Sequence, residues 1–496
     1  MSSLKDPLHN VLTEAPLLAK TAREDSLPLV VDLDGTLIRS DLLVESFFAL
    51  MAMRPLAALQ ALLTLGAGKA ALKARIADEA AVDLHTLPMN EALLDYIQAE
   101  RDRGRQVFLA SASDRRYVEA LAAHLGLFDG VFGSDGVRNL AGRAKADVLV
   151  EAFGRGGFDY AGNADADIPV WDCARGILVV NASAALLGRV RRRFADRDVT
   201  CLAPRSLPVR HYVRALRAHQ WLKNILVFVP LLAAHRFSLN GLLTVILAFG
   251  SFSLCASSVY LLNDLVDLRS DRLHHSKRRR PFASGEVPLL HGLALQPLLL
   301  LAAGGLALAL PWRFSIVLVA YYALTLGYSL ALKRLAVIDV VTLACLYGVR
   351  LVAGGVAAAA PLSPWLMAFS IFLFFSLAVV KRVTELLENI RRGKEAPAGR
   401  GYHLSDVPIL EAMAAASGYV AVMVLALYIN SPAVSELYAS PERLWPICIA
   451  ILIWVSRILL LTHRGQMHDD PVVFAAKDRF SLITFAIVAA IVGASL

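Results

Sequence analysis

Charged residues and cysteines are scarce in this sequence. Charged residues make up 19% of the 496 residues, while hydrophobic residues make up 57%. Soluble globular domains carry about a quarter charged residues, so this composition excludes an ordinary soluble enzyme and predicts contact with lipid. The five cysteines show no paired spacing, so neither a disulfide framework nor a zinc site is indicated; they are Cys173, Cys201, Cys255, Cys345 and Cys448.

The charges that are present are unevenly distributed. Residues 1 to about 206 carry charges throughout, whereas apolar runs of spanning length follow one another from about residue 219. This change predicts a tail over 1–24, a soluble domain over 25–206 and a membrane domain over 207–496. The opening segment MSSLKDPLHN is polar, so no signal peptide is predicted.

The membrane domain is predicted to contain nine transmembrane helices. Each apolar run is close to the roughly 20 residues that a helix needs to cross a bilayer core. The predicted spans are 219–237, 240–262, 289–309, 312–331, 336–357, 363–381, 408–430, 443–462 and 479–496.

The segments between these spans alternate in charge. Most Lys and Arg lie at 263–288, 332–335, 382–407 and 463–478, and almost none lie near 238, 310, 360 and 435. The positive-inside rule places the basic segments in the cytoplasm. We therefore expect a multi-pass protein of the inner (plasma) membrane. Its soluble domain is expected in the cytoplasm, because the first span leaves from that side.

Two aspartates follow an apolar strand in the soluble domain. The stretch LPLVVDLDGTLIRSD predicts a strand that ends at Asp32 and Asp34. Side chains alternate along a strand, so both carboxylates point the same way at the end where open α/β sheets build their sites. They can divide the roles of nucleophile and acid/base, and Mg²⁺ would let both stay ionised. An acidic turn after a buried strand is the alternative.

Three further segments follow in order along the chain. QVFLASASD predicts a second strand that ends in Ser111, Lys145 follows in NLAGRAKADVLVEAFG, and FDYAGNADADIPVWDCA runs into an acidic loop with Asn163, Asp165 and Asp167. Over residues 25–200 this series resembles the haloacid dehalogenase (HAD) superfamily of phosphatases. The resemblance implies an α/β domain with a Rossmann-type parallel sheet and a helical cap.

The same resemblance implies roles for individual residues. Asp32 would be the nucleophile that takes up the phosphoryl group, and Asp34 the general acid/base. Ser111 and Lys145 would hold the phosphoryl oxygens. The implied reaction is hydrolysis of a phosphomonoester through an aspartyl-phosphate.

The implied metal site contains one departure from the family pattern. Mg²⁺ would lie between Asp32, the carbonyl of Asp34 and the fourth motif, which includes Asn163 and Asp167. That motif usually begins Gly-Asp, whereas this sequence has Gly-Asn. An amide oxygen can bind Mg²⁺ but brings no charge, so weaker metal binding or a slower rate is expected.

Residues 41–92 are predicted to form the helical cap. Within them, 55–68 is an apolar run of about 14 residues between Arg54 and Lys69, which is too short to cross a bilayer. It either forms the core of the cap or touches the membrane, so that a lipid-borne phosphate reaches Asp32.

In the membrane domain, acids stand next to bases in NDLVDLRSDRLHHSKRRRPFASG, residues 263–285. On a helix, Asn263, Asp267 and Asp271 fall at i, i+4 and i+8 with Asp264 beside them, so they share one face. Carboxylates on one face repel one another unless a cation lies among them. Mg²⁺ carrying a diphosphate is the expected cation complex.

The basic run in the same segment fits a phosphate ligand. Lys277, Arg278, Arg279 and Arg280 can neutralise the oxygens of a leaving diphosphate. A solvated cytoplasmic loop explains the basic run alone equally well. It does not explain the acids, which are costly at the end of a span without a use.

The pattern NDxxDxxxD resembles the first signature of the UbiA superfamily of intramembrane prenyltransferases, over residues 207–496. That resemblance implies an all-α polytopic fold and Mg²⁺. The supporting stretches are RAHQWLKNILVFVPLL and YSLALKRLAVIDVVTLACLYGVRLVAGG. The second stretch offers only Asp339 where aromatic prenyltransferases commonly carry two acids.

Three further stretches resemble the phosphoribosyltransferase branch of that superfamily: KRVTEL, RGYHLSD and MHDDPVVFAAKDRFS. The branch moves 5-phosphoribosyl from phosphoribosyl diphosphate to polyprenyl (decaprenyl) phosphate. A fused phosphatase would then remove the 5-phosphate, and each domain would use one Mg²⁺. The implied substrate-binding residues are Lys223, Asn224, Lys277, Arg278, Tyr328, Lys333, Asp339, Arg350, Lys381 and Arg382.

Other interpretations stay open at the level of sequence. The membrane domain is alternatively an aromatic prenyltransferase that uses a polyprenyl diphosphate, and the soluble domain a separate phosphatase or an inactive binding module. A transporter is less favoured, because the acids lie at span ends and not at midplane breaks. No nucleic-acid partner is expected, and a homo-oligomer is compatible with the sequence.

Overall fold

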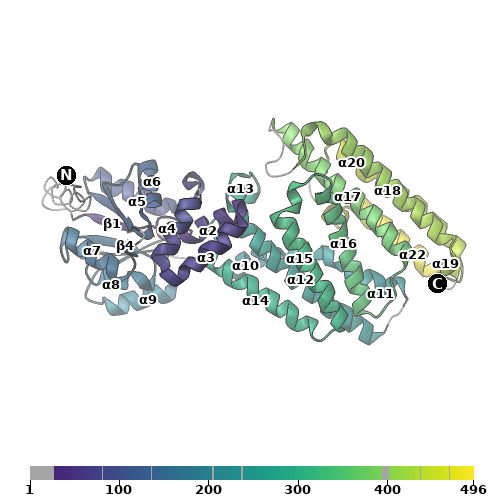
Figure 1. Cartoon of the computed structure of the whole chain (residues 1–496), viewed down its shortest axis with the longest axis horizontal. Coiled ribbons are helices and arrows are strands. Elements are labelled where there is room, and N and C mark those ends of the chain that lie inside the picture. The colour runs from purple at the N-terminus through teal and green to yellow at the C-terminus, as the bar shows by residue number, and fades with distance from the viewer. Residues whose placement is uncertain are drawn as a thin grey trace, which may run out of the picture. The chain divides into compact units, whose positions relative to one another are not determined.

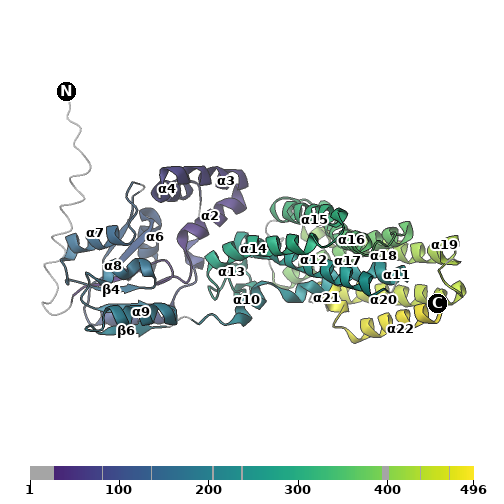
Figure 2. The same ribbon diagram turned by 90° about the horizontal axis from the view of Figure 1, so that it is seen from below.

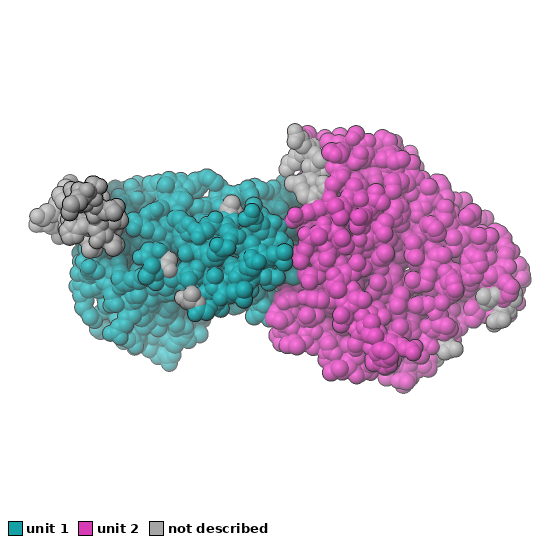
Figure 3. All heavy atoms as spheres, viewed as in Figure 1, with its two compact units in different colours: residues 1–215, 262–294 teal, residues 216–261, 295–496 magenta. Residues whose placement is uncertain are grey.

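The computed structural model describes residues 27–80, 82–135, 137–203, 206–235, 238–393, 401–435, 437–467 and 470–495. The predicted tail at 1–24 therefore lies outside the described residues. The chain forms two compact units (Figure 3). Unit 1 contains Met1–Ala215 and Leu262–Ala294, and unit 2 contains Leu216–Leu261 and Leu295–Leu496.

Unit 1 is built on a six-stranded parallel sheet, as the sequence predicts. The strand order is β3-β2-β1-β4-β5-β6, which places β1 in the middle beside β2 and β4. The strands are β1 (Leu29–Asp32), β2 (Val107–Asp114), β3 (Gly130–Ser134), β4 (Asp159–Gly162), β5 (Ile177–Val180) and β6 (Val199–Leu202).

Helices cover both faces of this sheet, because side chains of alternating direction along β1 are apolar on both sides. Leu29 and Val31 pack on one face with α5 (Glu91–Asp102) and α6 (Arg115–Leu125). Val30 packs on the other face with α7 (Arg143–Phe153), α8 (Ile168–Trp171) and α9 (Ala184–Arg193). This double cover leaves the carboxyl ends of the strands as the open edge.

Helices also occupy the predicted cap. They are α2 (Leu42–Met53), α3 (Pro55–Leu63), the 3₁₀ turn η3 (Thr64–Ala67), α4 (Lys69–Glu79) and η4 (Leu84–Thr86). Asp41 caps α2 by accepting from Val44 N at 2.9 Å, and a proline at the first position starts α3. Such N-terminal signals fix where helices begin. Figure 2 shows α3 and α4 as a pair set off from the sheet of the same unit.

Unit 1 also contains α10 (Val209–Ala215) and a helical segment from the membrane-spanning part of the chain. The latter holds the end of α12 (Leu239–Val266), then α13 (Leu268–Leu273), the 3₁₀ turn η7 (Lys277–Arg279) and the start of α14 (Leu289–Ala307). The acid-rich motif is part of this segment.

Unit 2 is all-helical, as predicted (Figure 1). Besides the remainder of α12 and α14, it contains η6 (Ala218–Phe228), α11 (Val229–Ala233), α15 (Trp312–Leu330), η8 (Leu332–Arg334), α16 (Ile338–Ala357), α17 (Pro364–Arg391), η9 (Leu404–Asp406), α18 (Val407–Ile429), α19 (Pro432–Ser435), η10 (Pro441–Leu444), α20 (Trp445–His463), α21 (Pro471–Ala475) and α22 (Arg479–Ser495).

The prediction of nine spans is not confirmed: the described residues contain seven helices long and apolar enough to cross a membrane. The expected span at 219–237 is a 3₁₀ helix followed by the short α11, with the polar side chains of Lys223 and Asn224 buried. The expected last span is α22, whose 17 residues fall just below spanning length. Hydropathy identifies both runs as apolar. It does not reveal that the first run is mainly a 3₁₀ helix or that the helix in the second run is too short.

Candidate active sites

The two aspartates of the soluble domain lie at the open edge of the sheet. Asp32 ends β1; its neighbour on β2 is Ala110, and the pairing of β1 with β4 ends one residue earlier, at Val31 opposite Ala161. Asp34 follows in a turn in which Gly35 has a φ of +77°. A side chain there would be strained and would meet the amide of Asn163 at 2.1 Å, so the glycine allows the fourth motif to approach the first.

Asp32 is buried and bound on both oxygens. Its Oδ1 accepts from Lys145 Nζ at 2.6 Å, and its Oδ2 accepts from Thr36 Oγ1 at 3.1 Å. Burial raises the pKa of Asp32 to about 7; Lys145 opposes this shift, while the carboxylates of Asp167 and Asp34 add to it. The site thus concentrates negative charge against one lysine.

Asp34 joins the first and second motifs. Its Oδ2 accepts from Ser111 Oγ at 3.0 Å and from Ser113 Oγ at 2.7 Å, and its Oδ1 accepts from Leu42 N at 2.7 Å. Ser111 Oγ also accepts from Ser113 N at 2.9 Å. The structure therefore brings the predicted Asp34 and Ser111 into direct contact, and adds Ser113, which the sequence pattern did not single out.

A buried network connects Lys145 to the fourth motif. Lys145 Nζ donates to Tyr160 Oη at 3.0 Å, and Tyr160 Oη donates to Asp167 Oδ1 at 2.9 Å. Asp167 Oδ2 accepts from the backbone N–H groups of Asn163 and Ala164 at 2.9 and 3.0 Å. Although burial alone lowers the pKa of Lys145, Asp32 and Asp167 raise it above its usual value. The lysine is therefore held as a cation.

Among the described residues, no group of three or more His, Cys, Asp or Glu side chains could hold a metal ion. The implied ligand set also includes the Asp34 carbonyl and the Asn163 amide. Besides burial, the carboxylates of Asp167 and Asp34 raise the pKa of Asp32, as expected where carboxylates surround the place of a cation. The donor set therefore fits Mg²⁺.

The acid-rich motif is nearly, but not wholly, one helix. α12 ends at Val266 and α13 begins at Leu268, with Asp267 between them as its N-cap. The backbone bonds from Asp267 N to Asn263 O and from Asp271 N to Asp267 O, both 2.8 Å, keep the helical spacing. Asp264 and Asp271 are buried, and Asn263 and Asp267 are half-buried.

Arg280 is the cation that pairs with these acids. Its Nη1 lies 3.1 Å from Asp264 Oδ1 and 2.5 Å from Asp271 Oδ2. Burial raises the pKa of Asp271 to about 6, with Arg280 opposing and Asp264 adding to the shift. One guanidinium nitrogen of Arg280 thus lies among the acids, where the sequence predicts a cation. This position fits a binding site for Mg²⁺. Lys277 and Arg278 lie nearby in η7, half-buried and exposed respectively.

A second cluster of predicted residues lies within unit 2. Asp470 Oδ2 accepts from Lys223 Nζ at 2.7 Å and from Lys381 Nζ at 2.9 Å. Asp470 Oδ1 accepts from Tyr347 Oη at 3.4 Å and from Val472 N at 3.2 Å. Lys223 is buried and Lys381 half-buried, and two lysines that converge on one carboxylate can bind a phosphate in its place. The neighbouring residues 468 and 469 of the same motif lie outside the described residues.

Arg350 joins this region through Asn224. Arg350 Nε donates to Asn224 Oδ1 at 2.8 Å, and Arg350 Nη2 donates to Tyr321 Oη at 3.0 Å. Its guanidinium also lies 5.7 Å from the centre of the Tyr347 ring. Two of the predicted substrate-binding residues, Asn224 and Arg350, are therefore direct partners.

Other predicted residues are placed differently. Asp339 and Arg382 form a fully buried ion pair at 2.8 Å, and Tyr402 Oη donates to Asp339 at 2.5 Å. Because a buried charge without a partner is costly, the two side chains of such a pair mainly hold each other in place. Tyr328 lies in the last turn of α15, and Lys333 lies in the following turn, η8.

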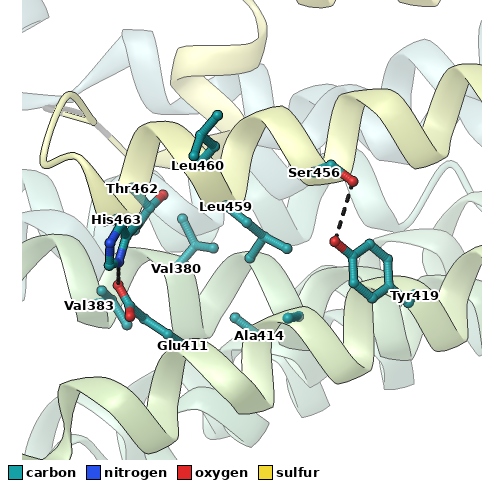
Figure 4. A pocket seen from close by; sticks show the side chains of 11 residues that line it. Val380, Val383, Glu411, Ala414, Tyr419, Ser456, Leu459, Leu460, Thr462 and His463 are labelled. Atoms are coloured by element: carbon teal, nitrogen blue, oxygen red, sulfur yellow. Dashed lines mark hydrogen bonds and ion pairs between the residues drawn. The ribbon is translucent and has the colours of Figure 1, made fainter.

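Unit 2 also contains a cavity of about 300 Å³ between α17, α18 and α20 (Figure 4). Four of its polar residues form two pairs, His463 with Glu411 at 3.0 Å and Tyr419 with Ser456 at 3.3 Å, and Thr462 donates to Ile458 O. None of its lining residues belongs to the predicted sites.

Sequence reasoning missed several residues of these networks: Lys73, Ser113, Tyr160 and Asp470. Lys73 of α4 donates to Ala112 O at 2.5 Å and to Asn139 Oδ1 at 2.9 Å, which connects the cap to β2. Asp470 stands in a stretch that resembled the phosphoribosyltransferases, so that stretch held the signal. Tyr160 sits among apolar strand residues, where nothing marked it.

Comparisons with known proteins agree with this geometry. The chain matches the UbiA prenyltransferase family over residues 224–483 and the haloacid dehalogenase-like hydrolases over residues 29–171. Both resemblances drawn from the motifs are thereby confirmed.

Three relatives are similar to this chain. An uncharacterised protein of Sinorhizobium fredii, y4nM, is 39% identical over 93% of this chain and 90% of its own length. The nodulation protein NoeC of Azorhizobium caulinodans is 36% identical over 56% of this chain and 91% of its own length. The decaprenyl-phosphate phosphoribosyltransferase of Mycobacterium tuberculosis is 39% identical over 38% of this chain and 64% of its own length, so the match spans less than two thirds of that enzyme.

Proposed function

This chain belongs to the UbiA prenyltransferase family and carries a HAD-like hydrolase domain, and from that premise we propose that it performs two successive reactions. In the first, 5-phosphoribosyl passes from phosphoribosyl diphosphate to a polyprenyl phosphate, and diphosphate leaves. In the second, the HAD-like domain hydrolyses the 5-phosphate, so that the product is polyprenyl-phosphoryl-ribose. We place both reactions at the cytoplasmic face of the inner membrane.

In the transfer, the acid-rich motif binds the donor. Asp264, Asp267 and Asp271 would hold the Mg²⁺ that neutralises the diphosphate of the donor. Arg280, now bound to Asp264 and Asp271, is the side chain that must move or share its partners when this complex forms. Lys277 and Arg278 supply positive charge for the departing diphosphate.

The acceptor of the transfer is already anionic. A phosphate oxygen of the lipid attacks C1 of the ribose as the bond to the diphosphate breaks, so no strong general base is required. Lys223 and Lys381 are suited to hold a phosphate, because they already share one carboxylate oxygen of Asp470. Arg350, positioned by Asn224 and Tyr321, adds a third fixed cation in the same unit.

In the hydrolysis, Asp32 attacks the phosphorus as the nucleophile, and Asp34 acts as the general acid and base. Lys145 holds Asp32 in place and neutralises charge that develops on the phosphoryl oxygens. Ser111 and Ser113 fix the Asp34 carboxyl, whose proton goes to the leaving ribose oxygen and is later replaced from the attacking water. The Mg²⁺ held by Asp32, the Asp34 carbonyl and Asn163 would allow a dianionic phosphate to approach two carboxylates.

One observation carries the proposal: phosphatase motifs, with Asn163 in the fourth motif, are fused to a UbiA-type domain, and transfer of 5-phosphoribosyl would make a phosphomonoester for them to hydrolyse. The similarity to a decaprenyl-phosphate phosphoribosyltransferase supports the choice of donor and acceptor. An aromatic prenyltransferase would produce no phosphomonoester for the fused domain.

The test is mass spectrometry of lipids after purified protein is incubated with phosphoribosyl diphosphate, polyprenyl phosphate and Mg²⁺. We expect polyprenyl-phosphoryl-ribose from the unaltered protein and no ribosylated lipid from Asp271→Asn. If the unaltered protein consumes no phosphoribosyl diphosphate but joins a polyprenyl diphosphate to an aromatic acid, the proposal is wrong.

A further inference from the structure

The cap helix α3 buries small side chains and exposes large apolar ones, which is the reverse of what a water-soluble domain is expected to show. Its buried residues are the small Ala58 and Ala61, which pack on Leu72 and Ile76 of α4. Its large residues face outward, with Leu56 76% and Leu63 81% exposed. A helix that only covers a protein core in water places its large apolar residues inward.

The outward residues form one patch, which we call the leucine face. It extends from the end of α2 through η3 and consists of Met53, Leu56, Leu59, Leu62, Leu63 and Leu65, all exposed. Single exposed leucines are ordinary, but six large apolar side chains within 13 residues are not. The leucine face therefore requires a partner that is apolar.

The charged residues that flank the leucine face in the sequence are positive. No Asp or Glu occurs from Ser46 to Ala77. Arg54 and Lys69, which flank the face, are exposed. An apolar stripe flanked by exposed cations matches the surface of a bilayer that contains anionic lipid.

Contacts within unit 1 bind this part of the cap to a segment that meets the membrane. Glu45 of α2 pairs with Arg272 of α13, at 2.5 and 3.1 Å, and both side chains are buried. Arg272 lies six residues after Val266, where the apolar helix α12 ends. Six helical residues extend only about 9 Å, and α3 follows α2 directly.

We propose that the leucine face binds the lipid surface and holds the phosphatase cap at the membrane, where a lipid-linked phosphomonoester presents its phosphate to Asp32. The lipid-linked nature of the substrate rests on the proposed function, whereas the membrane contact does not. Lys73 connects the cap helices that carry the leucine face to the sheet of the phosphatase site. Its side chain extends from α4, which packs on α3, to the backbone oxygen of Ala112 in β2.

Photocrosslinking locates the contact. We would incorporate a benzophenone amino acid at position 56 or 63 of the full chain, in nanodiscs of phosphatidylglycerol and phosphatidylethanolamine, and detect lipid adducts by mass spectrometry. Position 137, which is 92% exposed in the same unit, is the control. We expect adducts at 56 and 63 at least about tenfold more abundant than at 137. Equal yields at all three positions would overturn the proposal.

Activity measurements separate this inference from the proposed function. In the double variant Leu59→Ser and Leu63→Ser, we expect hydrolysis of the 5-phosphorylated lipid to fall about tenfold. Hydrolysis of the water-soluble p-nitrophenyl phosphate should stay unchanged, as both should in Val137→Ser. Equal loss with both substrates, or no loss with either, would contradict a lipid-presenting role. If the unaltered protein hydrolyses only the soluble ester, the proposed function fails, and the crosslinking still decides the membrane contact.

Discussion

The two acidic sites of unit 1 are neutralised in different ways. Asp32 is paired with Lys145, which is itself bound to Tyr160 and through it to Asp167. Asp264 and Asp271 share one nitrogen of Arg280, which comes from the segment after η7. The Lys145 side chain is 5% exposed and that of Arg280 is 26% exposed.

This difference indicates two kinds of anion chemistry. Lys145 belongs to a packed network and is in place before a substrate arrives, as expected for a group that stabilises a transition state. Arg280 is more exposed to solvent, so the acids can exchange it for a metal ion with its diphosphate. We infer that the phosphatase site is built around a permanent cation and the acid-rich site around a replaceable one.

The largest expected effect is the loss of the phosphatase nucleophile. Asp32→Asn should reduce hydrolysis of p-nitrophenyl phosphate by at least about 10³-fold, because an amide cannot act as the nucleophile that takes up the phosphoryl group. The rate of nitrophenol release in full-length protein, with Asp271→Asn as a control of unchanged rate, provides the measurement. Substantial hydrolysis by Asp32→Asn would show that Asp32 is not the nucleophile.

The two cations should differ in their importance. Lys145→Gln should lower phosphatase turnover about 10²-fold, since one charged donor to the transition state is removed. Arg280→Gln should lower transferase turnover less than about tenfold, because the metal complex replaces this cation during the reaction. Steady-state assays of each reaction compare the two variants. Similar losses would remove the distinction between permanent and replaceable cations.

The acidity of Asp32 should appear in the pH profile of hydrolysis. Burial raises the pKa of Asp32 to about 7 in the absence of metal, and a bound Mg²⁺ would lower it; a proton blocks the nucleophile below the pKa, so the rate should fall in acid, at a pH below 7 when Mg²⁺ is bound. Each unit below the pKa lowers the ionised fraction about tenfold. In Lys145→Gln the profile should move to higher pH, because the group that favours ionisation is gone. A profile that stays in place would argue against this pairing.

The smallest effect is expected at Asn163. In Asn163→Asp the amide near the proposed Mg²⁺ becomes a carboxylate, so the Mg²⁺ concentration for half-maximal hydrolysis should fall several-fold. The Mg²⁺ dependence of transfer is the internal control and should not change. If the Mg²⁺ requirement of hydrolysis is unaltered, Asn163 does not bind the metal.

The sequence predicted the local features of unit 1 well. The resemblance to the HAD superfamily predicted the parallel sheet, alternation along the first strand placed Asp32 and Asp34 on one side at its carboxyl end, and helical spacing placed Asp264 and Asp271 on one side. These features depend on residues close together in the chain, where backbone geometry fixes the relation.

Long-range partners were not predictable from one sequence. Lys145 and Asp32 are 113 residues apart, and Lys223 and Asp470 are 247 residues apart. No local pattern selects one lysine over another as the partner of an acid. The same limit applies to Arg382 and Asp339, which the motifs singled out separately and which the fold pairs with each other.

The central claim is that one chain performs transfer and hydrolysis in sequence, and a complementation assay tests it most directly. Asp32→Asn and Asp271→Asn proteins would be incubated separately and together with phosphoribosyl diphosphate, polyprenyl phosphate and Mg²⁺, and the lipids identified by mass spectrometry. We predict that Asp32→Asn accumulates the 5-phosphorylated lipid, that Asp271→Asn makes no ribosylated lipid, and that the mixture restores polyprenyl-phosphoryl-ribose. If Asp32→Asn alone yields polyprenyl-phosphoryl-ribose as efficiently as the unaltered protein, the claim is contradicted.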